Sequence, residues 1–150
     1  MSPEPVRYGE DNWIVFVSHA GSDTWVARQI ATHITAKGAV PFLDEADIAK
    51  GEDFEERILT ALDRANELVV LLTPWSLKRP YVWMEIGAAW IKRILIVGVL
   101  HGITAEELQA QAGVPIQIKS RNLVNINDLD KYFEQLGERV AINPGKDKGK

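Results

Sequence analysis

The clearest absence in this chain of 150 residues is cysteine, which does not occur. A chain without cysteine has no disulfide, no thiolate zinc ligand and no thiol nucleophile, and it fits a reducing compartment. Long apolar runs are missing too. The longest, ILIVGVL at residues 94–100, is too short to cross a bilayer, and the N-terminal MSPEPVRYGEDN has no signal-peptide hydrophobic stretch. We therefore expect a cytoplasmic protein without membrane contact.

Sequence fingerprints for phosphate, metal and nucleic acid are absent as well. Neither G-x-G-x-x-G nor a Walker loop occurs in the chain. Seven carboxylates fall within residues 44–56, but they do not occupy the alternating positions of a calcium loop. The formal net charge of −4 argues against a nucleic-acid binder, which usually has a basic surplus on one face. The sequence predicts no metal site and no direct nucleic-acid binding.

The composition is that of an ordinary globular domain, with 46% hydrophobic and 25% charged residues. We expect one domain over residues 12–141. Residues 1–11 are polar and contain proline, which predicts a flexible leader. Residues 142–150, which end in NPGKDKGK, have no means of packing and predict a disordered tail or a linker.

Strand and helix patterns alternate along the chain. Short apolar runs bounded by polar residues predict buried strands, and helical periodicity or helix signals lie between them. This alternation predicts a parallel sheet with helices on both faces. Right-handed crossovers favour a flavodoxin-like three-layer α/β sandwich with the five strands in the order 2-1-3-4-5. The predicted strands are residues 13–17, 39–43, 67–73, 94–100 and 122–126.

Two helices of this pattern are informative. Asp23 is expected to cap the helix that follows the first strand. In the third helix, RPYVWMEIGAAWIKR, Tyr81 and Glu85 lie on one face, because residues four apart are neighbours. On spacing alone, Glu85 reaches solvent, pairs with Arg79 or Lys92, or serves a site. The adjoining face of this helix is a predicted core stripe of Val82, Ile86, Ala89 and Trp90.

The corner after the first strand, SHAGSD, lies where α/β proteins bind ligands. A phosphate loop is disfavoured there, because Asp23 would bring negative charge close to the anion. A phosphoacceptor receiver domain needs an acidic pair after the first strand and an aspartate after the third. Ser18, His19 and Thr73 occupy those places instead. His19 fits equally a ligand contact or a hydrogen bond within the loop, and Ser18 fits equally a ligand contact or the end of the strand.

Taken together, three stretches resemble the Toll/interleukin-1 receptor (TIR) domain family over roughly residues 12–140. They are FVSHAGSD, GAVPFLDEADIAKGEDFEERI and LVVLLTPWSLKRPYVWMEI, in the order and at the spacing of the family's motifs. The sequence departs from the family pattern at two positions. Tyr81 stands in the aromatic place of a Trp-x-x-x-Glu motif, and Thr73 replaces the usual serine.

The resemblance implies one of two roles. Many TIR domains are NAD+ hydrolases that cleave the nicotinamide–ribose bond to give ADP-ribose or a cyclic ADP-ribose. Others are non-catalytic adaptors that assemble with further TIR domains. In the enzymes a glutamate on the third helix is catalytic, and Glu85 matches it. The cleft would then be framed by Ser18, His19, Phe42, Asp44 and Tyr81. NAD+ would be the substrate, so no resident cofactor is implied.

The resemblance also implies partners. Self-association through the 44–52 loop would complete the site of a neighbouring copy, and a sensor domain or subunit would trigger signalling in immunity or antiviral defence. A third function also remains open, that of a nucleoside deoxyribosyltransferase, which has a similar α/β fold and a glutamate nucleophile. It would exchange bases on deoxynucleosides instead of releasing nicotinamide.

Overall fold

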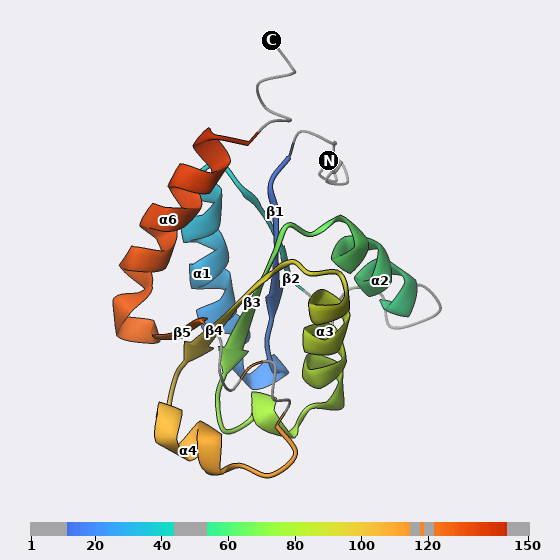
Figure 1. Cartoon of the computed structure of the whole chain (residues 1–150), viewed down its shortest axis with the longest axis vertical. Helices are drawn as coiled ribbons and strands as arrows, with labels where there is room; N and C mark the ends of the chain where they lie inside the picture. The colour runs from blue at the N-terminus through green and yellow to red at the C-terminus, as the bar shows by residue number, and fades with distance from the viewer. Residues whose placement is uncertain (1–11, 44–53, 115–117, 119–121, 144–150) are drawn as a thin grey trace.

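The computed structural model describes residues 12–43, 54–114, 118 and 122–143. Five parallel strands form one sheet in the order β2-β1-β3-β4-β5 (Figure 1). The predicted flavodoxin-like α/β fold and its strand order are therefore confirmed. The strands are β1 (Ile14–Ser18), β2 (Val40–Leu43), β3 (Glu67–Leu72), β4 (Leu95–Leu100) and β5 (Asn122–Asn125).

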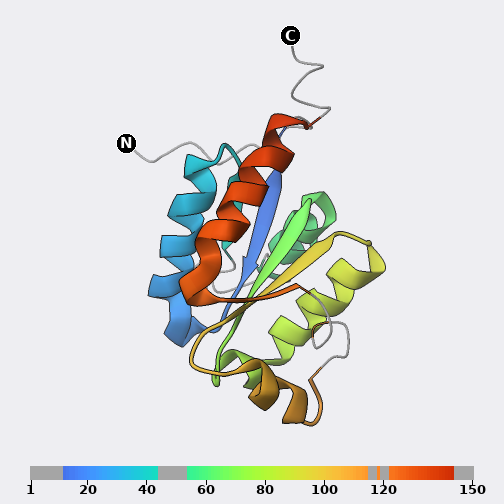
Figure 2. The same cartoon turned by 60° about the vertical axis from the view of Figure 1, so that its left-hand side comes forward.

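Helices cover both faces of the sheet. α1 and α6 lie on one face, and α2 and α3 lie on the other (Figures 1 and 2). The α-helices are α1 (Thr24–Ala36), α2 (Phe54–Arg64), α3 (Pro80–Ile91), α4 (Ala105–Ala110) and α6 (Leu129–Ala141). Short 3-10 turns precede three of them: η1 (Gly21–Asp23), η2 (Ser76–Lys78) and η3 (Ile126–Asp128).

The two layers of helices enclose two separate hydrophobic cores. Successive side chains of a strand point to opposite faces of the sheet, so each central strand supplies both cores. Ile14 and Phe16 of β1 pack with α2 and α3, whereas Val15 and Val17 pack with α1 and α6. Every residue of β1 and of β3 is buried, which explains why these strands read as continuous apolar runs. Pro41 lies in β2, at the sheet edge, as the sequence predicts.

Two expectations for the helices are wrong. Asp23 is the residue before α1, but its side chain makes no capping hydrogen bond, because its carboxylate is used by another element. Trp90 was placed in the core stripe of α3, yet it is 47% exposed. Val82, Ile86 and Ala89 pack against the sheet, and Trp90 lies at the margin of this buried arc, so much of its indole is exposed. The predicted leader, the 44–52 loop and the tail from residue 144 lie outside the described residues.

A buried polar network ties three elements together at the amino edge of the sheet. Glu67, the first residue of β3, has no exposed surface, and Arg139 donates to both of its carboxylate oxygens at 2.8 Å. Tyr132 donates to Oε1 at 2.9 Å and the Trp13 indole to Oε2 at 2.6 Å. Burial raises the pKa of the Tyr132 hydroxyl above its usual range, and the adjacent Glu67 carboxylate raises it further. α6 is thereby held to the start of β3.

No α-helix among residues 12–43, 54–114 and 122–143 is both long and apolar enough to cross a bilayer. Within the same part of the chain, no three His, Asp or Glu side chains come together as ligands for a metal ion.

Candidate active site at the carboxyl edge of the sheet

The centre of the candidate site is a carboxylate that lies inside the protein. Glu85 of α3 has no exposed surface, and its Oε1 accepts a hydrogen bond from Ser18 Oγ at 3.2 Å. Ser18 is the last residue of β1 and is equally buried. The strand end and the third helix, 67 residues apart in sequence, therefore meet at this contact. Helical spacing allowed Glu85 to reach solvent or to pair with Arg79 or Lys92. In the structure it accepts a hydrogen bond from a buried serine.

The local sequence explains why Glu85 points inward. Pro80 begins α3 at the carboxyl edge, where a proline costs no helical hydrogen bond. The helix then buries Val82, Ile86 and Ala89 against the sheet. Glu85 lies between Val82 and Ile86 on this buried side, so its side chain is directed toward the end of β1. A buried carboxylate is costly unless it is hydrogen-bonded, and Ser18 supplies a donor.

His19 follows Ser18 and is also buried, with 7% of its surface exposed. Its Nδ1 lies 3.3 Å from the carbonyl oxygen of Val17. A hydrogen bond at this position requires the proton on Nδ1, since a carbonyl oxygen only accepts. In the neutral ring Nε2 is then an acceptor. This contact favours the tautomer of His19 that carries its proton on Nδ1.

A second buried link joins the same corner to the end of β3. Thr73 Oγ1 donates to Asp23 Oδ2 at 2.6 Å. The side chains of Thr73, Asp23 and Ser76 are all buried. Thr73 Oγ1 also accepts from the backbone N–H of Ser76 at 3.0 Å. Ser76 Oγ in turn accepts from the Thr73 N–H at 2.8 Å. Sequence reasoning missed this link, although Asp23 and Thr73 both follow strands whose ends meet at one edge.

The other predicted site residues differ in their burial. Phe42 of β2 is half-buried, and its ring packs on Phe16 of β1 with 5.0 Å between the ring centroids. Tyr81, the second residue of α3, lies one turn before Glu85 and is 44% exposed. Asp44 lies outside the described residues. The structure therefore brings Ser18 and Glu85 into contact, with His19 next in the chain, and leaves Tyr81 at the surface.

This arrangement suits one kind of chemistry. A carboxylate shielded from water interacts strongly with positive charge that develops close to it, because little solvent screens the interaction. The hydroxyl of Ser18 orients one carboxylate oxygen. Since Glu85 has no exposed surface, a substrate reaches it only after neighbouring groups have moved. The site fits stabilisation of a cation in a closed environment.

Fold and site together define a class of protein: a parallel α/β domain with a buried carboxylate behind the carboxyl edge of its sheet. The family follows from comparison with known proteins. The family model of the TIR domain matches residues 15–140, and the chain belongs to this family. The resemblance found in the sequence is confirmed.

One relative with a named activity is similar to this chain in sequence. The probable 2' cyclic ADP-D-ribose synthase BdTIR of Brachypodium distachyon is 28% identical over 132 residues, covering 87% of this chain and 57% of that protein. The chain thus spans little more than half the length of this relative.

Solved structures show the same fold. The TIR domain of the Toll-related receptor TRR-2 from Hydra magnipapillata has a TM-score of 0.62 at 18% identity, covering 85% of this chain and 97% of that one. A 2-desoxiribosyltransferase from Leishmania mexicana has a TM-score of 0.62 at 12% identity, covering 84% and 97%. At these identities the likeness establishes the fold alone.

Proposed function

We propose that this TIR domain is an NAD+ hydrolase that cleaves the bond between nicotinamide and ribose. The products are nicotinamide and ADP-ribose or a cyclic ADP-ribose. The observation that supports this most is the buried Glu85 carboxylate held by Ser18 at the carboxyl edge of the sheet. The relative named as a probable cyclic ADP-ribose synthase adds support at 28% identity.

The reaction requires a negative charge near the ribose and does not require a general acid. The nicotinamide of NAD+ is cationic, so it leaves with the electron pair of the C1′–N bond and becomes neutral without being protonated. Positive charge then develops on the ribose as an oxocarbenium ion, as in glycoside hydrolysis. Glu85 stabilises this charge. Water completes hydrolysis and loses a proton, or a nucleophilic atom elsewhere in the same molecule closes the ring of a cyclic product.

The remaining predicted residues have supporting roles in this proposal. Ser18 orients Glu85, and His19 presents a polar ring at the same corner. Phe42 and Tyr81 line the cleft with aromatic surface, on which the nicotinamide ring stacks. Asp44 contacts the ribose hydroxyls. NAD+ is the substrate, and no resident cofactor or metal takes part.

Replacement of Glu85 by glutamine is the direct test. The substitution keeps the shape of the side chain and removes its charge, so we expect nicotinamide release from NAD+ to fall at least about a hundredfold, the order seen when a transition-state stabilising group is lost. Free nicotinamide is measured by chromatography with concentrated protein. The matched control is Glu106→Gln, because Glu106 is an exposed carboxylate in the first turn of α4.

Three outcomes separate the candidate functions. Equal activity of wild type and Glu85→Gln would contradict the role of Glu85. Silence of the wild type, even when crowded, would favour a non-catalytic adaptor, a role that the surface-exposed Tyr81 also fits. Base exchange on a deoxynucleoside, assayed in parallel, would instead indicate a deoxyribosyltransferase, for which only the fold gives support.

We further propose the setting in which the enzyme works. It acts in the cytoplasm in immune or antiviral signalling, is activated by self-association through the 44–52 loop, and is linked to a sensor domain or subunit. The Hydra relative, a TIR domain of a receptor, gives an example of such a link.

A further inference from the structure

The loop between β3 and α3 presents an exposed tryptophan and two exposed cations at the carboxyl edge of the sheet. Trp75 is 55% exposed, and Lys78 and Arg79 are exposed as well. Ser76 and Leu77, which lie between them in the chain, are buried. Residues three apart lie on the same side of a 3-10 turn, so the indole and the first cation share the outer side of η2. This outer side is aromatic and basic.

Hydrogen bonds hold the start of this loop to the corner that contains the candidate site. The Thr73 hydroxyl donates to the Asp23 carboxylate at 2.6 Å and accepts from the backbone N–H of Ser76 at 3.0 Å. At the other end of the same corner, Ser18 donates to Glu85. Figure 1 shows the turn η2 beside the starts of α1 and α3, at the edge where β1 and β3 end. A loop that is already held in place loses little conformational freedom when a ligand binds to it.

The exposed charges of this part of the chain are all positive. Residues 68–104 include four lysine or arginine residues and one acidic residue, Glu85, which is buried. The whole chain, in contrast, has a formal net charge of −4. Within the residues that the structure describes, neither Lys78 nor Arg79 has a carboxylate partner. Both cations are therefore available to an anionic ligand.

The other described segments at the carboxyl edge lack such cations. Residues 19–23 after β1, 101–104 after β4 and 126–128 after β5 contain neither lysine nor arginine. Beyond the segment after β4, the first turn of α4 carries two exposed acidic residues. A ligand that reaches Glu85 and extends from it with a negatively charged group is therefore attracted to the loop after β3 and repelled by α4.

The proposed substrate extends with a group of this kind. In NAD+ the ribose that carries nicotinamide is joined through a diphosphate to adenosine. At a rise of 1.5 Å per residue, Arg79 lies about 9 Å before Glu85 along the axis of α3, with Lys78 and then Trp75 further along the loop. Carboxylate, cations and indole thus follow one another in the same order as the ribose, diphosphate and adenine of the dinucleotide.

We propose that the loop after β3 binds the ADP part of NAD+, with Lys78 and Arg79 on the diphosphate and the Trp75 indole stacked on adenine. Ammonium and guanidinium groups form strong, charge-assisted hydrogen bonds with phosphate oxygens. An exposed aromatic ring offers a stacking surface to a base. The inference rests on the proposed function and adds specificity to it, because the loop favours a dinucleotide over nicotinamide mononucleotide.

Binding of ADP tests the loop without turnover, because ADP carries no nicotinamide. One variant is Trp75→Ala, and the other is Lys78→Ala with Arg79→Ala. We expect the Kd for ADP, measured by isothermal titration calorimetry, to rise at least about tenfold in each, the order expected when a base loses its stacking partner or a phosphate its cations. Raising the salt concentration from about 50 to about 500 mM should weaken ADP binding to the wild type, since the cations are exposed.

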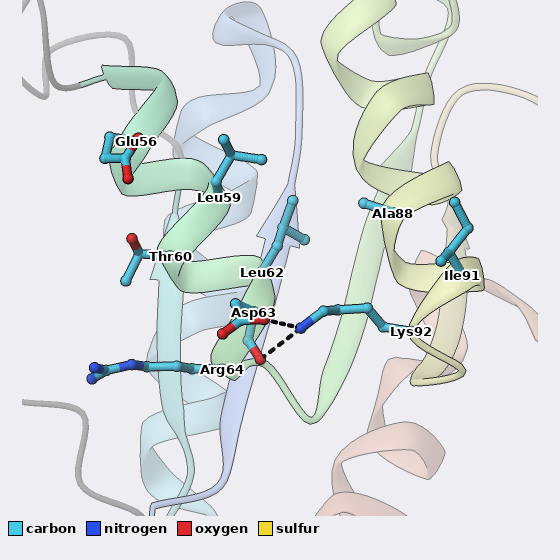
Figure 3. Close-up of a pocket in the computed structure, with 9 residues that line it drawn as sticks. All are labelled: Glu56, Leu59, Thr60, Leu62, Asp63, Arg64, Ala88, Ile91 and Lys92. Atoms are coloured by element: carbon cyan, nitrogen blue, oxygen red, sulfur yellow. Dashed lines mark hydrogen bonds and ion pairs between the residues drawn. The ribbon is translucent and has the colours of Figure 1, made fainter.

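Matched controls lie at the opposite end of α3. Trp90 is 47% exposed, and Lys92 and Arg93 are exposed cations. Figure 3 shows Lys92 reaching across the groove between α2 and α3 to Asp63, far along the helix from the loop after β3. Trp90→Ala, and Lys92→Ala with Arg93→Ala, make the same chemical changes, and both should bind ADP like the wild type.

Turnover gives a second readout. The preference for NAD+ over nicotinamide mononucleotide, expressed as the ratio of the two kcat/KM values, should fall at least about tenfold in Trp75→Ala, because only NAD+ carries adenosine. Loss of stability alone would lower activity on both substrates alike and leave this ratio unchanged.

Three results would overturn the assignment of the loop: no ADP binding by the wild type, equal losses in the loop variants and the controls, or wild-type ADP binding by Trp75→Ala. In each of these cases nicotinamide release by the wild type would leave the proposed function standing. Conversely, ADP binding that depends on the loop, without any release of nicotinamide from NAD+, would contradict the proposed activity and support the loop. The two failures are therefore distinguishable.

Discussion

Glu85 shows how far a single residue can be predicted from sequence. Helical spacing places it beside Tyr81, but spacing does not say whether the side chain is buried. That depends on a donor from another element, and the donor, Ser18, is 67 residues away. The family resemblance pointed to both residues without giving their contact. A carboxylate is buried where a hydrogen-bond donor is available, and a donor from a distant segment is known only once the fold is known.

Thr73 is the residue whose replacement best tests the second link at the carboxyl edge. Thr73→Val keeps the volume of the side chain but removes the hydroxyl that donates to Asp23 and accepts from Ser76. The buried Asp23 carboxylate then loses this donor, so we expect the free energy of unfolding to fall by about 1–3 kcal/mol more than in Thr73→Ser. Urea denaturation measures both variants. Equal stability of the two would mean that the hydroxyl contributes little.

At the scale of elements, the sequence patterns predicted the type of each segment more accurately than the burial of its side chains. The five strands and their order were predicted because buried strands read as apolar runs and alternation with helices forces parallel pairing. Trp90 was misplaced because spacing alone does not show where the buried arc of a helix ends. The Glu67 network was missed because a lone acid at a strand start carries no local signal.

Because of the Glu67 network, we expect the free energy of unfolding to fall at alkaline pH. The pKa of Tyr132 is raised above its ordinary value of 10.0, first by burial and then by Glu67. Above pH 10 the unfolded chain loses this proton while the folded chain keeps it. Stability is therefore complete below pH 10 and falls above it by about 1.4 kcal/mol per pH unit.

Tyr132→Phe removes this titration and provides the comparison. At neutral pH the variant should be less stable, by about 1–3 kcal/mol, because the hydrogen bond to the buried carboxylate is lost. Between pH 9 and 11 its stability should decline less steeply than that of the wild type, as measured by urea denaturation at each pH. Parallel curves would show that Tyr132 ionises alike in the folded and unfolded chains.

At the scale of the whole molecule, the two edges of the sheet differ in character. The amino edge is closed by the bidentate Arg139–Glu67 pair and its aromatic donors, which hold α6 and Trp13, the residue before β1, to the start of β3. At the carboxyl edge, hydroxyl groups of Ser18 and Thr73 donate hydrogen bonds to the carboxylates of Glu85 and Asp23. Hydroxyl contacts of this kind exchange more easily for a ligand's hydroxyl groups than a bidentate ion pair does. In the proposed reaction, a ribose hydroxyl would take the place of the Ser18 hydroxyl at Glu85.

Dilution tests whether assembly and catalysis are coupled in the intact protein. Glu85 has no exposed surface in the single chain, so access to it requires a rearrangement, and a neighbouring copy can stabilise the open arrangement. We expect nicotinamide release per molecule to fall as protein is diluted at constant NAD+. Specific activity that stays constant across the range in which sedimentation velocity detects association would show that catalysis does not depend on self-association.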